Sequence, residues 1–140
     1  MEKSVMYTPR LPDAKAAFSR GMKVDIGNVT QLFISGTASV DENAKTAHIG
    51  DFVEQVRWTY ANIESLLEQA GSAVSDIVKF TIYLKNMEEY ERFDELRVEF
   101  FNRHGITRTH YPASTCVEAR LCRDDLLVEI DAIALIPTKK

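Results

Sequence analysis

Near the C-terminus, residues 126–136 form an apolar run that two acids interrupt. Because successive side chains of a β-strand point to opposite faces of a sheet, Val128 and Ile130 share one face and Glu129 and Asp131 share the other. A carboxylate in the middle of an apolar strand is costly to bury unless it is paired or used chemically. The run therefore predicts a strand with apolar side chains on both faces, and it makes Glu129 the first candidate for a catalytic group.

Turn and cap signals divide the rest of the chain. Gly27 and Asn28 between two short β-rich runs predict a hairpin, whereas residues 1–20, with two prolines, predict an irregular lead-in. Cap and glycine signals predict two helices. In chain order we expect strands 22–26 and 31–35, a helix between Asp51 and Gly71, strand 77–84, a helix between Asn86 and Gly105, and two strands around the charged turn within residues 111–134.

This order predicts an α+β sandwich in which two helices lie on one face of a mostly antiparallel or mixed sheet. At 140 residues the chain is expected to form a single domain, residues 1–140. Two helices on one face leave the other face of the sheet uncovered. If that face is apolar, the chain must cover it by self-association, so we expect an oligomer.

Composition argues against several classes of protein. The net charge of −4 and the pI near 5.4 disfavour a nucleic-acid or membrane-surface binder, which needs a basic excess. No apolar stretch approaches the roughly 20 residues of a membrane span, and the N-terminus lacks a signal-peptide pattern. Cys116 and Cys122 make no disulfide framework, which predicts reduced thiols and a cytoplasmic location. The three histidines are scattered, so we expect no metal and no other cofactor.

Several short motifs are spread over nearly the whole chain: Phe33–Gly36, Gly50-Asp51, Gln55, Asn62-Ile63, Val78–Lys85, Phe100-Phe101, Pro112-Ala113, Cys116–Glu118 and Glu129-Ile130. Taken together they resemble the RidA family, also called YjgF or endoribonuclease L-PSP. The resemblance implies a chorismate-mutase-like fold that assembles as a homotrimer with clefts at the subunit interfaces. For the best-studied branch it also implies hydrolysis of amino-acid-derived enamines and imines to 2-oxo acids and ammonia.

The resemblance also implies which residues would form the site, and it shows two departures. Glu129 matches the family's water-handling acid, at the family's spacing from Cys116. That branch has a Pro-Ala-Arg-Ser motif, whose arginine binds the substrate carboxylate. Ser114 occupies the position of this arginine. A hydroxyl cannot replace the two charge-assisted hydrogen bonds of a guanidinium. Phe18 replaces the usual tyrosine. Ser35, Gly36 and the strand from Ser114 to Cys116 would shape the cleft around a small carboxylate substrate.

A different arginine must then supply the missing cation. Arg120 and Arg123 flank the charged turn, and Arg108 lies in the preceding loop. Arginines near a turn are more often solvated than bound to a ligand, so each is only a candidate. Glu129 has an ordinary alternative as well, as an edge-strand acid that faces solvent or pairs with Arg120 or Lys85.

Three segments carry a second resemblance: Ile34–Ser39, His48–Asp51 and Cys122–Glu129. They resemble the chorismatases, larger enzymes of a related fold that remove pyruvate from chorismate. In the chorismatase signature a cysteine precedes the glutamate by seven residues, as Cys122 precedes Glu129. This resemblance implies that Cys122, Arg123 and Glu129 belong to one site.

Three functions therefore stay open. They are imine or enamine hydrolysis, chorismatase-like chemistry, and a non-catalytic trimer that binds metabolites or proteins.

Overall fold

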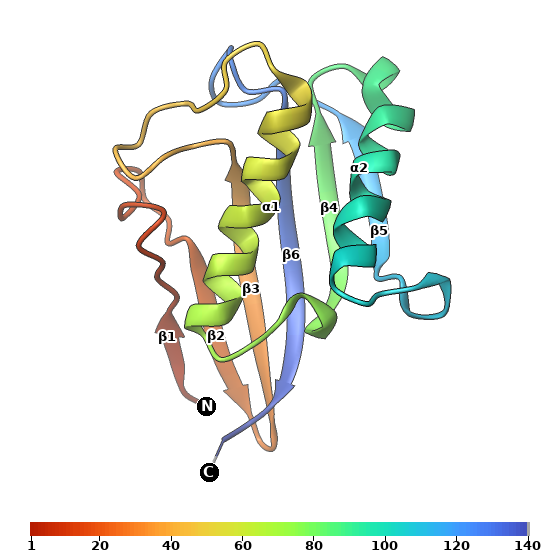
Figure 1. The fold of residues 1–140 in the computed structure, drawn as a ribbon. Coiled ribbons are helices and arrows are strands. Elements are labelled where there is room, and N and C mark those ends of the chain that lie inside the picture. Colours follow the sequence, from red (N-terminus) through yellow and green to blue (C-terminus); the bar gives the residue numbers. More distant parts are fainter. Residues whose placement is uncertain (140) are drawn as a thin grey trace.

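The computed structural model describes residues 1–139, which form one six-stranded sheet and two α-helices (Figure 1). The helices are α1 (Phe52–Gln69) and α2 (Tyr90–Arg103). Short 3₁₀ turns occupy Val74–Asp76, Met87–Glu89 and Arg108–His110. The strands are β1 (Lys3–Val5), β2 (Gly21–Ile26), β3 (Val29–Ala38), β4 (Ile77–Leu84), β5 (Ala113–Glu118) and β6 (Val128–Pro137).

The sheet has the strand order β1-β2-β3-β6-β4-β5. Neighbouring strands are antiparallel except β4 and β5, which are parallel, so the sheet is mixed as expected. The last strand, β6, lies between β3 and β4 in the middle of the sheet. Glu129 is therefore not an edge-strand acid, because its strand has a hydrogen-bonded neighbour on both sides.

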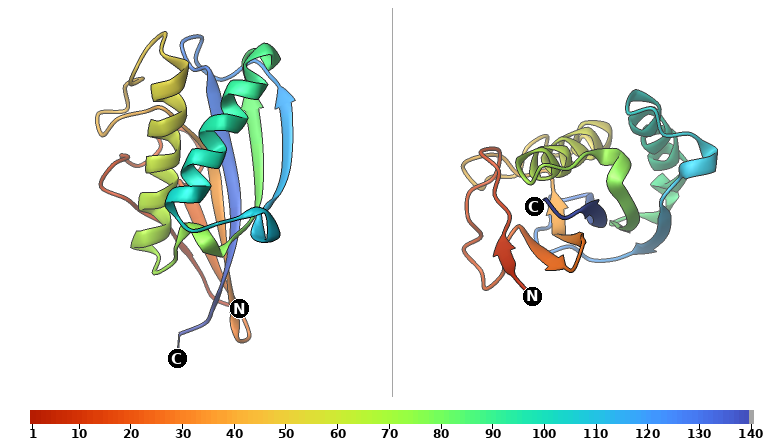
Figure 2. Two further views of the ribbon diagram at one scale, coloured as in Figure 1. Left: turned by 45° about the vertical axis from the view of Figure 1, so that its right-hand side comes forward. Right: turned by 90° about the horizontal axis from the view of Figure 1, so that it is seen from below.

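Both helices pack on one face of the sheet, which confirms the α+β sandwich (Figure 2). Along β6 the buried side chains of Val128 and Ile130 alternate with the half-buried side chains of Glu129 and Asp131. The buried set belongs to the same hydrophobic core as the apolar side of α1, whereas the two acids point to the face without helices. The alternation read from the sequence therefore assigns the faces of this strand correctly.

The face without helices carries apolar side chains that are still accessible in the single chain. Phe33 on β3, Val117 on β5 and Leu135 on β6 are each about 40% exposed. In register, Phe33 lies opposite Ile133, so these two apolar side chains adjoin on β3 and β6, whereas Val117 lies beside Tyr83, which is opposite Glu129. Apolar side chains that stay exposed on the open face of a sheet are typical of an interface.

The cap signals place the first helix correctly. The side chain of Asp51 accepts a hydrogen bond from the backbone N–H of Glu54, and Gly71 follows the helix with φ of 78°. The second helix begins later than expected. Asn86 caps the 3₁₀ turn instead, through the N–H of Glu88, and α2 starts only at Tyr90.

Two further expectations need correction. Residues 3–5 are not irregular, because they form β1 and pair with β2. The strand expected at 31–35 is longer, and its pairing with β6 shifts register between Ile34 and Thr37, so that Ser35 and Gly36 form a bulge. Within residues 1–139 no helix is both long and apolar enough to cross a bilayer.

Candidate functional site

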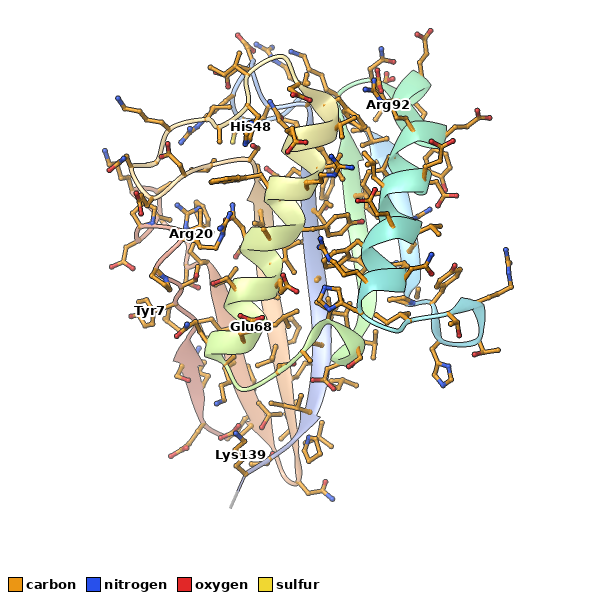
Figure 3. The ribbon with its side chains drawn as sticks, in the orientation of Figure 1. Tyr7, Arg20, His48, Glu68, Arg92 and Lys139 are labelled. Carbon is orange, nitrogen blue, oxygen red and sulfur yellow. The ribbon has the colours of Figure 1, made fainter. Side chains whose placement is uncertain are left out.

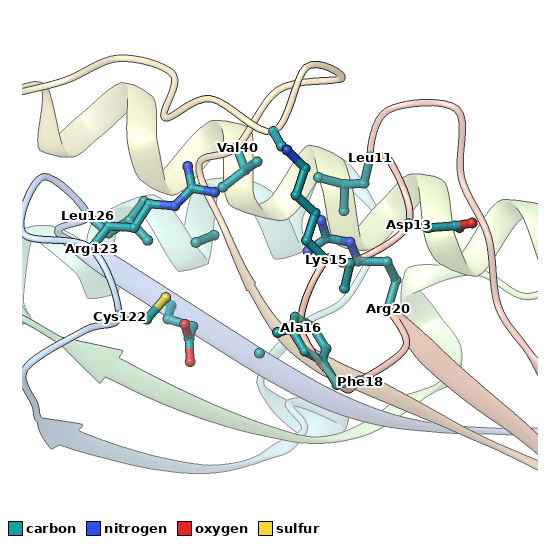
Figure 4. A pocket seen from close by; sticks show the side chains of 15 residues that line it. Leu11, Asp13, Lys15, Ala16, Phe18, Arg20, Val40, Cys122, Arg123 and Leu126 are labelled. Atoms are coloured by element: carbon teal, nitrogen blue, oxygen red, sulfur yellow. The ribbon is translucent and has the colours of Figure 1, made fainter.

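A cavity of about 270 Å³ lies between the N-terminal segment, the bulge of β3 and the loop between β5 and β6 (Figure 4). Glu129 lines it from the centre of the sheet. The apolar part of its wall comes from side chains on several segments. The lining residues are Leu11, Asp13, Ala14, Lys15, Ala16, Phe18, Arg20, Gly36, Ala38, Val40, Ala44, Cys122, Arg123, Leu126 and Glu129.

The bulge of β3 makes room for the Glu129 carboxylate. A Cβ atom at Gly36 would lie 2.5 Å from Oε2 of Glu129, which no real contact tolerates. Thr37 fixes the bulge by donating its hydroxyl to the carbonyl oxygen of Ser35 at 2.8 Å. The carboxylate therefore lies directly over the glycine backbone.

The surroundings of Glu129 favour its protonated form. Burial raises its pKa above the ordinary value of 4.5, and the negative charge of Asp131, two residues on, raises it further. Asp131 in turn accepts a hydrogen bond of 3.1 Å from the hydroxyl of Tyr83. A carboxyl group whose pKa is raised in a cavity is suited to transfer protons near neutral pH.

Ser35 positions the N-terminal segment rather than lining the cavity. Its hydroxyl donates to the carbonyl oxygen of Ser19 at 2.6 Å, and its N–H donates to the carbonyl oxygen of Arg20 at 3.1 Å. Arg20 is further fixed by its Nε, which donates to the carbonyl oxygen of Pro12 at 3.0 Å. Figure 3 shows Arg20 beside the N-terminal segment, on the side of the molecule away from α2.

Arg123 reaches the same cavity from the loop between β5 and β6. Its Nη1 donates to the hydroxyl of Thr46 at 3.3 Å, and that hydroxyl donates to Asp125 at 2.9 Å. The positive charge of Arg123 repels that of Arg20. Burial lowers the pKa of Arg20, and the repulsion from Arg123 lowers it further, against an opposing effect of Asp13. Two guanidinium groups therefore face one cavity.

A buried glutamine holds the loop that carries Arg123. The side chain of Gln55, on α1, is fully buried. Its Nε2 donates to the carbonyl oxygens of Asp125 at 2.9 Å and His48 at 3.2 Å, and its Oε1 accepts from the N–H of Leu127 at 2.8 Å. Gln55 thus ties the start of α1 to the segment that enters β6 just before Glu129.

The structure brings together five of the ten residues that the sequence suggests for the site, and Arg108, in the 3₁₀ turn before β5, does not line the cavity. Ser35 forms the bulge together with Gly36 but does not line the cavity. Arg20 was not suggested at all, and its only signal is its place two residues after Phe18. The five residues that line the cavity are Phe18, Gly36, Cys122, Arg123 and Glu129.

Ser114, Cys116 and Arg120 do not line this cavity in the single chain. Ser114 pairs in register with Phe80, so it lies on the helix side of the sheet, opposite to Glu129. Its hydroxyl accepts a hydrogen bond of 3.1 Å from Nη1 of Arg97. Their role in substrate binding stays a prediction, and it requires a second subunit to bring them near Glu129.

The surroundings of Cys116 and Arg120 differ from each other. Cys116 packs against the core, and burial raises the pKa of its thiol. Arg120 is highly exposed, with its guanidinium 3.9 Å from Asp124. Lys85 donates to the backbone oxygen of Asp124. The sequence allows Glu129 to be an ordinary acid paired with Arg120 or Lys85. Within residues 1–139 Glu129 has no salt bridge to either of them.

A metal site would need several ligands in reach of one another. The part of the chain that the structure describes contains no group of three or more His, Cys, Asp or Glu side chains that could hold a metal ion. The cavity lining offers the carboxyl groups of Asp13 and Glu129, the thiol of Cys122 and cationic side chains.

The sequence matches the model of a protein family described as endoribonuclease L-PSP over residues 8–136. It is 33% identical over 134 residues to a RutC family protein of Pyrococcus abyssi, covering 96% of this chain and 98% of that protein. To the 2-iminobutanoate/2-iminopropanoate deaminase of Escherichia coli it is 33% identical over 129 residues, covering 91% and 94%.

The fold agrees with solved structures of such proteins. The crystal structure of Escherichia coli TdcF with bound serine superposes with a TM-score of 0.80 at 30% sequence identity, covering 95% of this chain and 98% of that chain.

Proposed function

The chain belongs to the RidA/YjgF family of proteins, the endoribonuclease L-PSP family, and from that membership we propose that it hydrolyses a small amino-acid-derived imine or enamine to a 2-oxo acid and ammonia. The observation that carries the proposal is the position of Glu129. Its carboxyl group lies in a cavity, over a glycine, with a raised pKa. Two relatives named as deaminases of reactive intermediates support the reaction class.

Glu129 would act first as a base and then as an acid. As a carboxylate it takes a proton from a water molecule while the water oxygen attacks the carbon of the C=N bond. The protonated carboxyl group returns that proton to the nitrogen, which gives a carbinolamine. Glu129 then takes the hydroxyl proton of the carbinolamine and passes it to the nitrogen, the C–N bond breaks, and ammonia leaves as the carbonyl group forms. An enamine first needs a proton on its carbon, which a protonated Glu129 can also supply.

We infer further that the protein assembles as a homotrimer. The face of the sheet without helices presents Phe33, Val117 and Leu135, and their burial between subunits would contribute favourable free energy. Glu129 opens toward the same face. A neighbouring subunit could then bring Ser114 and Cys116 of its own chain to the cavity, which would complete a cleft between subunits.

The test is the release of 2-oxo acid from imines that an amino-acid oxidase generates in situ. Purified protein should accelerate the release, and the Glu129→Gln variant should lose the acceleration while its circular dichroism stays unchanged. Glu129→Gln keeps the shape of the side chain and removes only its ability to transfer a proton. Equal acceleration by both proteins would contradict the role of Glu129, and no acceleration by either would contradict the proposed reaction.

One observation favours a second candidate function. Cys122, Arg123 and Glu129 line the same cavity, as the chorismatase-like spacing of Cys122 and Glu129 implies. Removal of pyruvate from chorismate would begin with protonation of an enol ether carbon, for which Glu129 is the available acid. Pyruvate release from chorismate by the purified protein measures this directly. If neither imines nor chorismate are converted, the remaining candidate is a non-catalytic protein that binds metabolites or other proteins.

A further inference from the structure

The cavity of Glu129 has a different charge from the protein as a whole. Its ionisable lining residues are the cations Lys15, Arg20 and Arg123 and the acids Asp13 and Glu129. Fully ionised, this lining carries one positive charge, and it carries two when Glu129 is protonated. The whole chain has a net charge of −4. Positive charge is therefore concentrated at this cavity.

The two guanidinium groups are held in place by groups that leave them charged and available. A backbone carbonyl oxygen fixes Arg20, and the hydroxyl of Thr46 fixes Arg123. Within residues 1–139 neither guanidinium has a carboxylate within 4.0 Å. In Figure 4 the side chain of Asp13 extends away from Arg123. Two like charges near one cavity repel each other, and a bound anion relieves that repulsion.

The rest of the wall limits the size and character of the anion. Leu11, Ala38, Val40 and Leu126 give the cavity an apolar part. The volume of about 270 Å³ is near the lower end of the range of about 300–1,000 Å³ that is typical of ligand sites. A short carbon chain with charged ends fits these features better than a nucleotide or a peptide does.

We propose that Arg20 and Arg123 bind a carboxylate group and make the cavity selective for small ligands with two carboxylates, such as a dicarboxylic 2-oxo acid or its imine. When Glu129 is protonated the lining carries two net positive charges, so a ligand with one carboxylate would leave one of them uncompensated in a partly buried site. A second carboxylate compensates it. The inference rests on the proposed function in one respect, the oxo or imino group of the ligand. The number of carboxylates on the ligand is argued from the charges of the cavity lining alone.

The test compares two stable 2-oxo acids that differ in charge, 2-oxobutanoate and 2-oxoglutarate, by isothermal titration calorimetry at constant ionic strength. We expect 2-oxoglutarate to bind at least about tenfold more tightly, as one additional charged hydrogen-bonded contact would give. Arg20→Gln and Arg123→Gln should each remove most of this preference. Arg92→Gln is the control for the loss of one arginine charge, because Arg92 is exposed on α2 and does not line the cavity.

Three outcomes would overturn the inference. Equal affinity for the two acids would exclude selectivity for two carboxylates. A loss of preference in Arg92→Gln equal to that in Arg123→Gln would assign the preference to the overall charge of the protein. Inorganic phosphate that binds as tightly as 2-oxoglutarate would show a site for dianions of any kind. Because binding needs no turnover, a protein that prefers 2-oxoglutarate but hydrolyses no imine would contradict only the proposed reaction.

Discussion

The carboxylate of Glu129 occupies the space that a side chain at position 36 would need. A Cβ atom at Gly36 would lie 2.5 Å from Oε2 of Glu129 and 2.9 Å from its Cδ. The two residues are on neighbouring strands, and they meet because the pairing of β3 with β6 shifts register next to Gly36. The bulge therefore determines where the carboxylate can be.

Gly36→Ala tests this relationship. The added methyl group meets the end of a side chain rather than backbone, so Glu129 can turn away and the free energy of unfolding should change by less than about 1 kcal/mol. The displaced carboxylate should no longer reach the substrate, and imine hydrolysis should fall at least about 100-fold, as expected for a lost general base. Urea unfolding and the coupled oxidase assay measure the two effects, and full activity would contradict the assignment.

Glu129→Gln should also change how stability depends on pH. Burial and the charge of Asp131 raise the pKa of Glu129 in the folded chain. Between the ordinary value of 4.5 and this raised pKa, the folded state holds more protons than the unfolded state. Glu129 therefore makes the free energy of unfolding fall as the pH rises through that interval. The variant, which cannot ionise there, should be more stable than the natural chain above the interval.

Urea unfolding across pH 4 to 8 measures this difference. The curves of the variant and the natural chain should diverge as the pH rises and then run parallel. Glu68→Gln, on an exposed position of α1, controls for the loss of one acidic charge. A variant that is less stable than the natural chain at pH 8 would show that the carboxylate of Glu129 is stabilising, contrary to the burial described above.

The sequence predicts the sheet better than it predicts the site. The alternation along β6 depends only on local pattern, so it assigns Val128 and Glu129 to the correct faces. The bulge at Ser35 and Gly36 depends on the pairing of β3 with β6, which are about 100 residues apart, and local pattern does not contain it. Arg20 enters the cavity because Ser35 binds its backbone oxygen, again across strands.

Ser114 illustrates a different limit. A motif shows which residue type occupies a position, but it does not show on which face of the sheet the side chain lies. Here Ser114 lies on the helix side with Arg97, and Glu129 lies on the opposite side. Sequence proximity of the strands β5 and β6 could not predict this separation, because it depends on β4 lying between them.

Gln55→Leu should destabilise the loop that carries Arg123. The variant removes three hydrogen bonds and leaves the N–H of Leu127 and the carbonyl oxygen of Asp125 without this partner, whereas the carbonyl oxygen of His48 still accepts from the N–H of Asp51. Unsatisfied buried polar groups cost about 1–3 kcal/mol each, partly offset by solvent entry, so we expect a loss of about 3 kcal/mol. Gln69→Leu, at an exposed position of the same helix, should change stability by less than about 0.5 kcal/mol. Similar unfolding curves for the two variants would contradict the role of Gln55.

Phe33→Lys should separate the subunits of the proposed trimer. Phe33 lies in the middle of the apolar face, opposite Ile133, and an ammonium group there would have to be buried without a partner if the subunits stayed together. The natural chain should sediment as three copies of 15.9 kDa, and the variant as one. Ile49→Lys is the control, since Ile49 is 68% exposed in the loop before α1, so this variant should sediment like the natural chain. A natural chain that sediments as a monomer would contradict the proposed assembly, and a trimeric Phe33→Lys variant would place the interface elsewhere.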